Sequence, residues 1–365
     1  MRKAYTFDDV ALIPQYNNVP SRTVPKLDSW LTKNSKIEIP LLCANMDSTI
    51  SEELAEVLLK EGSIPIFHRF IDLETQKKWI KRWEDKIFVS CGIGKEKVQH
   101  TRELLDAGAK GVCIDVAHGH SEMMIHFIES LKKSHPDREI IAGNVCTAMA
   151  YHDLVNAGAD GVKVGIGPGA ACTTRIVTGF GMPQFSAIYE CAKIAEKLRV
   201  PLIADGGIRN SRDVVLALAA GASSVMIGKL FALTKESAAP KRESKTSPTG
   251  LEAKFRGQAS SDFQKEYYGG LKQNTVAEGI DFWANVTGSA SDLIDNLLGR
   301  IRSGLTYAGA KSIKELQRKA EFVEVSTNYK AESKPRPPKE TLEKTGATEE
   351  TLTLLKRLLE RNQIV

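Results

Sequence analysis

Residues 139–165 read EIIAGNVCTAMAYHDLVNAGADGVKVG, and the fold can be inferred from this stretch. Apolar runs stand near its two ends, at 139–143 and 160–164, and an amphipathic segment, TAMAYHDLVNAG, lies between them. Short runs that are apolar on both faces are typical of strands in a parallel sheet. The stretch therefore predicts a strand, a helix and a second strand in succession.

The same alternation continues in both directions along the chain. Apolar runs separated by helical patterns stand at 39–43, 63–67, 87–91, 111–115, 139–143, 160–164, 201–204 and 223–227. An Ala-Gly-Ala triplet closes three of the helical patterns, at 107–109, 157–159 and 220–222, where glycine accepts the left-handed conformation that ends a helix. Eight such units in order predict a (β/α)8 TIM barrel. A doubly wound open sheet is the competing arrangement, but its Gly-x-Gly-x-x-Gly turn does not follow the first strand.

The barrel pattern stops after residue 227, and helical patterning returns at 290–303 and 312–320. We expect a catalytic barrel domain over 1–325 that includes a mobile flap at about 233–285, after the eighth strand. A polar, proline-containing linker is expected over 326–346. An amphipathic tail helix that Thr348 could cap is expected over 347–365.

Composition limits the classes of function. The 365 residues include 50 basic and 45 acidic side chains, for a formal net charge of +5, and 42% of the chain is hydrophobic. This is globular composition without a run of eighteen apolar residues, so we expect no membrane partner. The small positive excess fits an anionic small substrate, and we expect no nucleic-acid partner. The N-terminus lacks the apolar core of a signal peptide, which favours a cytoplasmic protein.

The six cysteines are dispersed, at 43, 91, 113, 146, 172 and 191, and form no C-x-x-C pair. We therefore expect no structural zinc site, and we interpret the five cysteines other than Cys172 as buried apolar side chains. His118 and His120 stand near Asp115, which would suit a metal, but the sequence offers no clear fourth ligand.

Polar residues follow the predicted strands, at the end of the barrel where TIM-barrel enzymes carry their active sites. They are Asn45-Met46-Asp47, His68-Arg69, Asp115, Asn144, the loop GIGPGAACTTR (Gly165–Arg175), Asp205-Gly206-Gly207 and Gly228-Lys229. Cys172 lies in the glycine-rich loop, whose amides could lower a thiol pKa and so produce a nucleophile; the alternative is an inert buried cysteine. Asp205 suits a ribose diol, or it caps the next turn.

Several motifs together resemble the IMP dehydrogenase and GMP reductase family. They are TFDDVALIP at 6–14, ANMDST at 44–49, AGNV at 142–145, VGIGPGAACTTR at 164–175, ADGGIR at 204–209 and AEG at 277–279. The resemblance covers residues 5–325. It implies a barrel, usually a homotetramer, that acts on a purine nucleotide with a nicotinamide cofactor.

The resemblance also implies roles for individual residues. Cys172 would attack C2 of the purine, and Thr174 and Glu278 would handle the proton at the leaving group. Asp115 and Asn144 would contact the nicotinamide end of the cofactor, and the backbone carbonyls of Gly165, Gly167 and Cys172 would hold a potassium ion. The expected substrate-binding residues are Asn45, Met46, Asp205, Gly206, Gly207, Gly228, Lys229, Gly257 and Gln258.

Four features favour the reductase branch of the family. Dehydrogenases activate water with an Arg-Tyr pair, whereas this chain has Lys265-Glu266-Tyr267. The flap over 257–278 is short, residues 45–47 have the reductase form, and the segment between Phe67 and Ile87 has no room for a regulatory insert. We therefore predict NADPH-dependent reductive deamination of GMP to IMP and ammonia. The alternatives are an IMP dehydrogenase without the insert, which converts IMP to XMP with NAD, an altered purine substrate, or a silent nucleotide-binding barrel.

The chain departs from the family pattern where the substrate phosphate is expected. Ala170, Lys229 and Phe255 stand at positions where the family carries hydroxyl side chains. We expect the Lys229 ammonium to compensate, joined by Arg256, because a charged donor bonds phosphate more strongly than a hydroxyl does.

Overall fold

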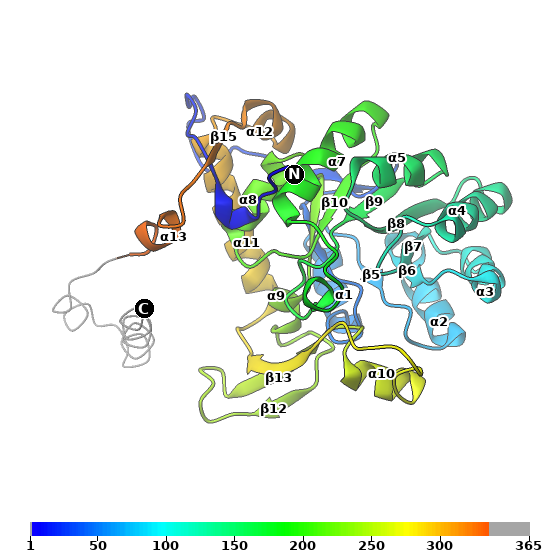
Figure 1. Ribbon diagram of the computed structural model, residues 1–365. Coiled ribbons are helices and arrows are strands. Elements are labelled where there is room, and N and C mark those ends of the chain that lie inside the picture. Colours follow the sequence, from blue (N-terminus) through cyan, green and yellow to red (C-terminus); the bar gives the residue numbers. More distant parts are fainter. Residues whose placement is uncertain (1, 336–365) are drawn as a thin grey trace.

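The structure is a computed structural model and describes residues 2–335. Its centre is an eight-stranded parallel sheet that curls into a nearly closed barrel (Figure 1). The strands are β4 (Leu41–Cys43), β5 (Ile66–Phe67), β6 (Phe88–Cys91), β7 (Gly111–Asp115), β8 (Glu139–Val145), β9 (Gly161–Val164), β10 (Leu202–Asp205) and β11 (Ser224–Ile227). They lie in the order β4-β11-β10-β9-β8-β7-β6-β5, so the first and second strands face each other across the seam. There the Ser63 hydroxyl donates to the carbonyl of Leu41 at 2.7 Å.

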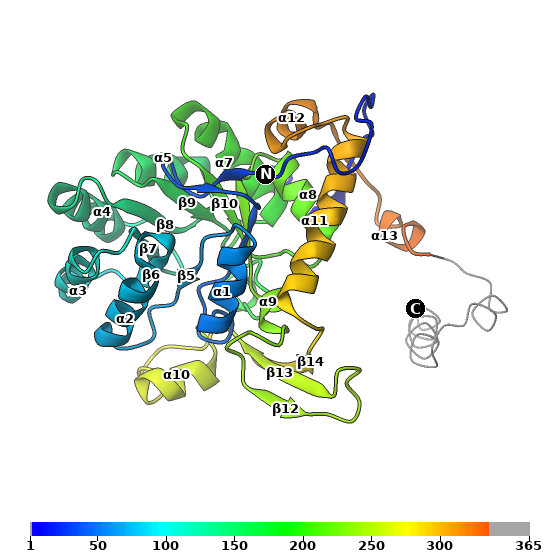
Figure 2. The same ribbon diagram turned by 180° about the vertical axis from the view of Figure 1, so that it is seen from behind.

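Helices surround the barrel. Those between the strands are α1 (Glu52–Lys60), α2 (Leu73–Trp83), α3 (Lys95–Asp106), α4 (Glu122–Ser134), α5 (Ala148–Asn156), α6 (Thr174–Thr178), α7 (Gln184–Leu198) and α8 (Ser211–Ala219). Three of these helices, α1, α4 and α5, are capped at their N-termini by Ser51, Ser121 and Thr147. In each case the side-chain oxygen accepts a hydrogen bond from a backbone amide of the first turn. After β11 come α9 (Lys229–Ala232), α11 (Ala290–Tyr307) and α12 (Ile313–Lys319). Figure 2 shows α11 running along the outside of the barrel beside α1.

The core has two layers. The larger layer lies between the sheet and the helices. The smaller layer fills the barrel interior with Leu42, Ile66, Phe88, Cys113, Ile141, Ile203 and Met226, all of them buried. A hairpin of β2 (Ser29–Trp30) and β3 (Lys36–Ile37) adds Leu31 and Ile37 to this inner cluster. Because side chains fill it, the barrel is a packed support for the loops at its ends.

Two pairings join distant parts of the chain. Near the N-terminus, η1 (Phe7–Asp9) leads into β1 (Val10–Leu12), which pairs antiparallel with β15 (Phe322–Glu324). The flap, residues 233–285, forms a three-stranded sheet of β12 (Lys241–Glu243), β13 (Leu251–Arg256) and β14 (Asp281–Asn285), with α10 (Ser261–Tyr268) between the last two strands. In both views the flap sheet and α10 lie at the same end of the barrel (Figures 1 and 2).

These observations confirm the predicted barrel, and each of the eight apolar runs overlaps a strand. Gly108, Gly158 and Gly221 have φ of +100°, +115° and +111°, as the helix-ending triplets predicted. The predicted linker contains a short helix, α13 (Tyr329–Glu332). A 3-10 helix, η2 (Glu84–Lys86), follows α2. Residues 336–346 of the linker and the predicted tail helix lie outside the described residues. Among residues 2–335, no helix has the length and apolar character needed to cross a membrane.

Candidate active site

The loop after β9 carries Cys172. The φ angle of Gly165 is +151°, and a Cβ there would lie 2.0 Å from the carbonyl oxygen of Asp205, so only glycine fits. Further along, the amide of Cys172 donates to the carbonyl of Gly169 at 3.0 Å. The Cys172 Sγ lies 3.3 Å from Oγ1 of Thr174, the first residue of α6. A thiol and a hydroxyl are therefore paired in a tightly turned loop, as a nucleophile and its proton-relay partner would be.

The end of the flap runs along this loop and brings Glu278 to it. The amide of Thr173 donates to the carbonyl of Glu278 at 3.0 Å, and the amide of Ile280 donates to the carbonyl of Ala171 at the same distance. Cys172 and Gly279 also form a β-bridge. Residues more than one hundred positions apart are thus held together through their backbones, which places Thr174 and Glu278 in one neighbourhood.

Lys163 occupies the centre of the site, and the sequence analysis did not single it out. Its side chain is only 2% exposed, and its ammonium lies 2.6 Å from Oδ1 of Asp115 and 3.1 Å from Oδ2 of Asp205. It also donates to Oδ1 of Asn45 at 3.3 Å. Burial by itself would lower the pKa of Lys163, but the two carboxylates outweigh burial and raise it above its ordinary value. Lys163 is therefore a buried cation that holds three predicted binding residues.

Amide side chains extend this network. The Asn144 Nδ2 donates to Oδ2 of Asp205 at 2.9 Å and to the carbonyl of Gly165 at 2.8 Å, while its buried Oδ1 has no protein partner. The Gln258 Nε2 donates to the carbonyl of Asn45 at 3.1 Å. The predicted cofactor residue Asn144 is thus bonded directly to the predicted ribose residue Asp205, and its free acceptor faces no protein donor.

The predicted phosphate region is partly apolar. Phe255 is buried and packs edge-on against Phe282, with their ring centroids 5.7 Å apart. The exposed Lys229 begins α9, and its ammonium lies 5.5 Å from the centre of the Phe282 ring. Gly228 lies beside the same group, since a Cβ there would be 3.3 Å from the Phe255 ring. Lys229 is therefore the cation of this corner of the site.

The remaining predicted glycines lie where backbone segments approach closely. Gly206 and Gly207 have φ of +87° and +78°, and a Cβ on either would meet Pro168 of the loop after β9. A Cβ on Gly257 would lie 2.9 Å from the carbonyl oxygen of Ala171. Gly167, with φ of +86°, lies against the Arg175 side chain. These contacts hold the loops after β10 and β13 against the loop after β9, which carries Cys172.

The structure corrects the hypothesis for Arg256. Its guanidinium is bonded to Asp47, Asp262 and Glu266, with 2.9 Å between Nε and the Asp47 carboxylate and 2.9 Å between an Nη and the Asp262 carboxylate. Arg256 is 9% exposed. A guanidinium that is buried and bonded to three carboxylates is not available to bind a phosphate.

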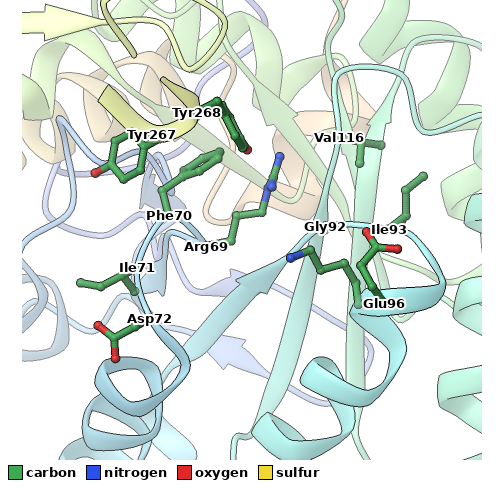
Figure 3. Close-up of a pocket in the computed structure, with 11 residues that line it drawn as sticks. Arg69, Phe70, Ile71, Asp72, Gly92, Ile93, Glu96, Val116, Tyr267 and Tyr268 are labelled. Carbon is green, nitrogen blue, oxygen red and sulfur yellow. The ribbon is translucent and has the colours of Figure 1, made fainter. Parts of the chain in front are cut away.

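Beside the site lies a cavity of about 690 Å³, which we call the outer pocket (Figure 3). Its lining comes from the loops after β5, β6 and β7, from the start of α3 and from α10. The lining residues are Arg69, Phe70, Ile71, Asp72, Gly92, Ile93, Glu96, Lys97, Val116, Tyr267 and Tyr268. Figure 3 shows the Arg69 side chain extending between the aromatic rings and Val116, the residue after Asp115. The Arg69 Nε is buried without a hydrogen-bond partner. The outer pocket therefore adjoins the Asp115 side of the site and contains an unsatisfied donor.

Sequence reasoning named Arg69 as a strand-end residue but missed the aromatic wall of this pocket. Phe70 stacks edge-on against Phe263 at 4.5 Å and lies 5.6 Å from the ring of Tyr267. The signal available in the sequence was the group of aromatic residues in the flap, at 263, 267 and 268. Which strand-end loop these rings would meet depends on the path of the flap across the barrel.

The other cysteines and histidines are largely structural. Cys43, Cys91, Cys113 and Cys191 are buried as expected, and burial raises the pKa of Cys91 to about 12. Cys146 is only partly buried, although it packs against the larger core layer. The His120 Nε2 lies 2.9 Å from Asp153 of α5. Over residues 2–335, no group of three or more metal-ligating side chains comes together.

Comparisons with known proteins identify the family and the fold. A family model described as IMP dehydrogenase / GMP reductase domain matches residues 4–336. The chain is 35% identical to an inosine-5'-monophosphate dehydrogenase of Cryptosporidium parvum, over 91% of this chain and 94% of that protein. It is 37% identical to GMP reductase 2 of Bos taurus, over 89% of this chain and 95% of that protein. A GMP reductase from Trypanosoma brucei, solved in complex with guanosine 5'-monophosphate, matches with a TM-score of 0.85 and 25% identity, over 93% of this chain and 98% of that one.

Proposed function

The chain belongs to the IMP dehydrogenase / GMP reductase family of oxidoreductases, and from that premise we propose that it is a GMP reductase. It would convert GMP and NADPH, with two protons, into IMP, NADP⁺ and ammonium. Relatives named as dehydrogenases and as reductases match it at similar identity, so the choice between the two reactions depends on the residues of the site.

The observation that carries the proposal is the surroundings of Glu266. By resemblance, position 266 corresponds to the arginine of the water-activating pair in dehydrogenases. In this chain the residue is Glu266, and its carboxylate is bonded to the guanidinium of Arg256. An arginine at 266 would face Arg256 as a like charge without its carboxylate partner. The flap of this chain is therefore built around an acid, and nothing at 265–267 supplies the arginine that water activation needs.

The proposed chemistry uses three residues. The Cys172 sulfur would attack C2 of the purine and the 2-amino group would leave as ammonia. Once a hydride has been added at C2, departure of the thiolate would restore the purine as IMP. Thr174, 3.3 Å from the Cys172 Sγ, and Glu278, held beside it by the flap, would deliver the proton to the leaving amine. The nicotinamide cofactor supplies the hydride that replaces the amino group at C2.

The donor set fits the cofactor and the ion. Asp115 and the unpartnered Oδ1 of Asn144 offer acceptors to a carboxamide, and the outer pocket next to Asp115 has room for the rest of a dinucleotide. Arg69 and Lys97 line that pocket and would favour the phosphorylated cofactor, NADPH, although Asp72 and Glu96 lie there too. Carbonyls of the loop at Gly165, Gly167 and Cys172 are hard oxygen donors of the kind that a potassium ion takes.

The remaining assignments concern the purine nucleotide. Asp205 would accept from the ribose hydroxyls, and the glycines at 206, 207, 228 and 257 would let backbone amides approach the phosphate. Lys229 would supply the charge that the missing hydroxyls at 170 and 255 do not. Asn45, Met46 and Gln258, joined by the bond from Gln258 to Asn45, would line the base.

The test follows nicotinamide absorbance in four mixtures, with GMP or IMP and with the phosphorylated or unphosphorylated cofactor in the matching redox state. We expect loss of NADPH absorbance with GMP and stoichiometric release of ammonia. The Cys172→Ala variant should lose this turnover while still binding GMP, which calorimetry can measure. Reduction of NAD by IMP would overturn the reductase assignment in favour of a dehydrogenase. Silence in all four mixtures would overturn it in favour of a different purine substrate.

A further inference from the structure

Arg256 connects two parts of the molecule that each border a binding region. We propose that Arg256 is a positioning residue that latches α10 to the loop after β4, and that this latch keeps the wall of the outer pocket in place. The residues of the latch are Asp47, Arg256, Asp262 and Glu266. The consequence for binding rests on the proposed function, because it takes the nicotinamide dinucleotide as the ligand of the outer pocket.

One side of the latch is buried and lies next to the predicted purine contacts. Asp47 follows Asn45 and Met46 directly and is bonded to Arg256 through both Nε and an Nη. Its side chain is 5% exposed, and its Oδ1 is buried without a partner. The hydroxyl of Ser48 donates to the carbonyl of Arg256 at 3.2 Å. Arg256 is thus fixed to the β4 loop by its backbone as well as by its side chain.

The other side of the latch holds α10. One Nη of Arg256 is bonded to both Asp262 and Glu266, which stand one turn apart on that helix. The guanidinium also lies 5.4 Å from the ring centre of Phe263 and 5.7 Å from that of Tyr267. A single side chain therefore gathers two carboxylates and two rings of one short helix.

Two other side-chain bonds anchor the helix: the Lys254 ammonium lies 3.0 Å from the Asp262 carboxylate, and Nε2 of Gln264 donates to the carbonyl of Gln258 at 3.4 Å. Neither of these bonds reaches the loop after β4. Of its eight residues only Phe263 is buried, and a helix of two turns is marginal without tertiary contacts. Its next two residues after Glu266, Tyr267 and Tyr268, line the outer pocket (Figure 3). Phe263 and Tyr267 stack on each other at 4.6 Å and meet Phe70 of the β5 loop. Loosening the latch should therefore disturb the aromatic wall more than the purine contacts.

The flap provides a matched control. Arg242 is bonded to Glu252 through Nε at 3.0 Å and through an Nη at 2.8 Å, and its guanidinium lies 4.1 Å from the Trp283 ring. This pair has the same chemistry as Arg256 and Glu266, but it lies on the flap sheet and lines neither site. Variants of Arg242 or Glu252 therefore show the effect of removing an ion pair from the flap while the latch stays intact.

The experiment compares Glu266→Gln and Arg256→Met with Glu252→Gln and Arg242→Met. Hydrogen exchange of the amides at 261–268 is measured in the ligand-free protein, and KM is measured for NADPH and for GMP. We expect exchange at 261–268 to rise in the first pair only. KM for NADPH should rise about threefold for Glu266→Gln and about tenfold for Arg256→Met, with KM for GMP within twofold. The double variant Asp47→Asn/Arg256→Met guards against misfolding caused by an unpaired buried carboxylate, and it should show the same split.

Each outcome bears on the latch independently of the reaction. Exchange at 261–268 that stays unchanged in both latch variants overturns the latch, even if GMP and NADPH are turned over. Equal rises of KM for NADPH and GMP overturn its selective effect on the outer pocket. If the protein proves to oxidise IMP, the reductase assignment fails, but faster exchange at 261–268 in the latch variants still supports the latch. In that case KM is measured for the dinucleotide that the protein uses, in place of NADPH.

Discussion

Lys163 is the residue on which the centre of the site depends. Its ammonium serves Asp115, Asp205 and Asn45 in a region with almost no exposure, and removing one partner of a buried ion pair usually costs about 3–5 kcal/mol. We therefore expect Lys163→Met to lower the free energy of unfolding by about that amount in urea titrations. Part of the loss should return in Lys163→Met/Asp115→Asn, because the second substitution removes one of the two uncompensated carboxylates. Additive losses in the double variant would contradict this account, and Lys163→Arg serves as the charge-preserving control.

At this scale, sequence reasoning reaches residues whose position is a strand end. Cys172, Asp115, Asn144 and Asp205 were singled out because each follows a predicted strand, and the structure brings them into one region. Lys163 was missed because it stands inside an apolar run, in GVKV. A lone lysine in a strand buried on both faces is itself a signal, since it needs a buried partner, but the sequence does not say which carboxylates supply it. Arg256 was expected at a phosphate because the sequence does not show that Asp47, 209 positions away, and the acids of α10 pair with it.

At the scale of elements, the loop after β5 carries a pH-dependent contact. His68 is buried, and burial lowers its pKa to about 4. Its Nδ1 accepts from the amide of Phe70 at 3.2 Å, a bond that needs the neutral ring. The unfolded chain binds a proton near pH 6.5 and the folded chain does not, so stability should fall as pH drops from 6.5 towards 4. The contribution is about 3 kcal/mol at about 1.4 kcal/mol per pKa unit.

Urea unfolding between pH 7 and pH 4.5 measures this contribution. The His68→Asn variant should lose less stability on acidification than the unsubstituted protein, because asparagine does not titrate. His152→Asn, at an exposed position on α5, should keep the original acid dependence. An unchanged acid dependence in His68→Asn would show that the ring is not held neutral. The result matters for the outer pocket, because the same loop carries Arg69 and Phe70.

The elements differ in how far their sequence determines them. The eight barrel strands were predicted because each is a local apolar run that ends at a turn residue. The β2–β3 hairpin, the β1–β15 pair and the flap sheet were not predicted. Their strands are two to six residues long, and local periodicity does not identify the segment with which each strand pairs. The positions of these strands depend on which surfaces of the folded barrel remain to be covered, and a local stretch of sequence does not contain that information.

At the scale of the whole molecule, the predicted homotetramer has a candidate surface. Directly after the catalytic loop, Ile176 and Phe180 are 87% and 78% exposed, and Val177 is also exposed. Exposed apolar side chains grouped in sequence are typical of interfaces, and most soluble homo-oligomers are closed and symmetric. Because α6 begins at Thr174, a neighbour seated on these side chains would also steady the segment to which we assign the proposed proton relay.

Light scattering after size exclusion tests this surface. We expect a mass four times that of the 40.0 kDa chain. A Phe180→Asp variant should give a smaller species, because a carboxylate at the centre of an apolar interface is desolvated without a partner. Met123→Asp, an exposed apolar position on α4, is the control and should keep the larger mass. If both variants keep it, the interface lies elsewhere on the barrel. If Phe180→Asp dissociates and its kcat falls while its free energy of unfolding is unchanged, assembly supports the catalytic loop as well as the quaternary structure.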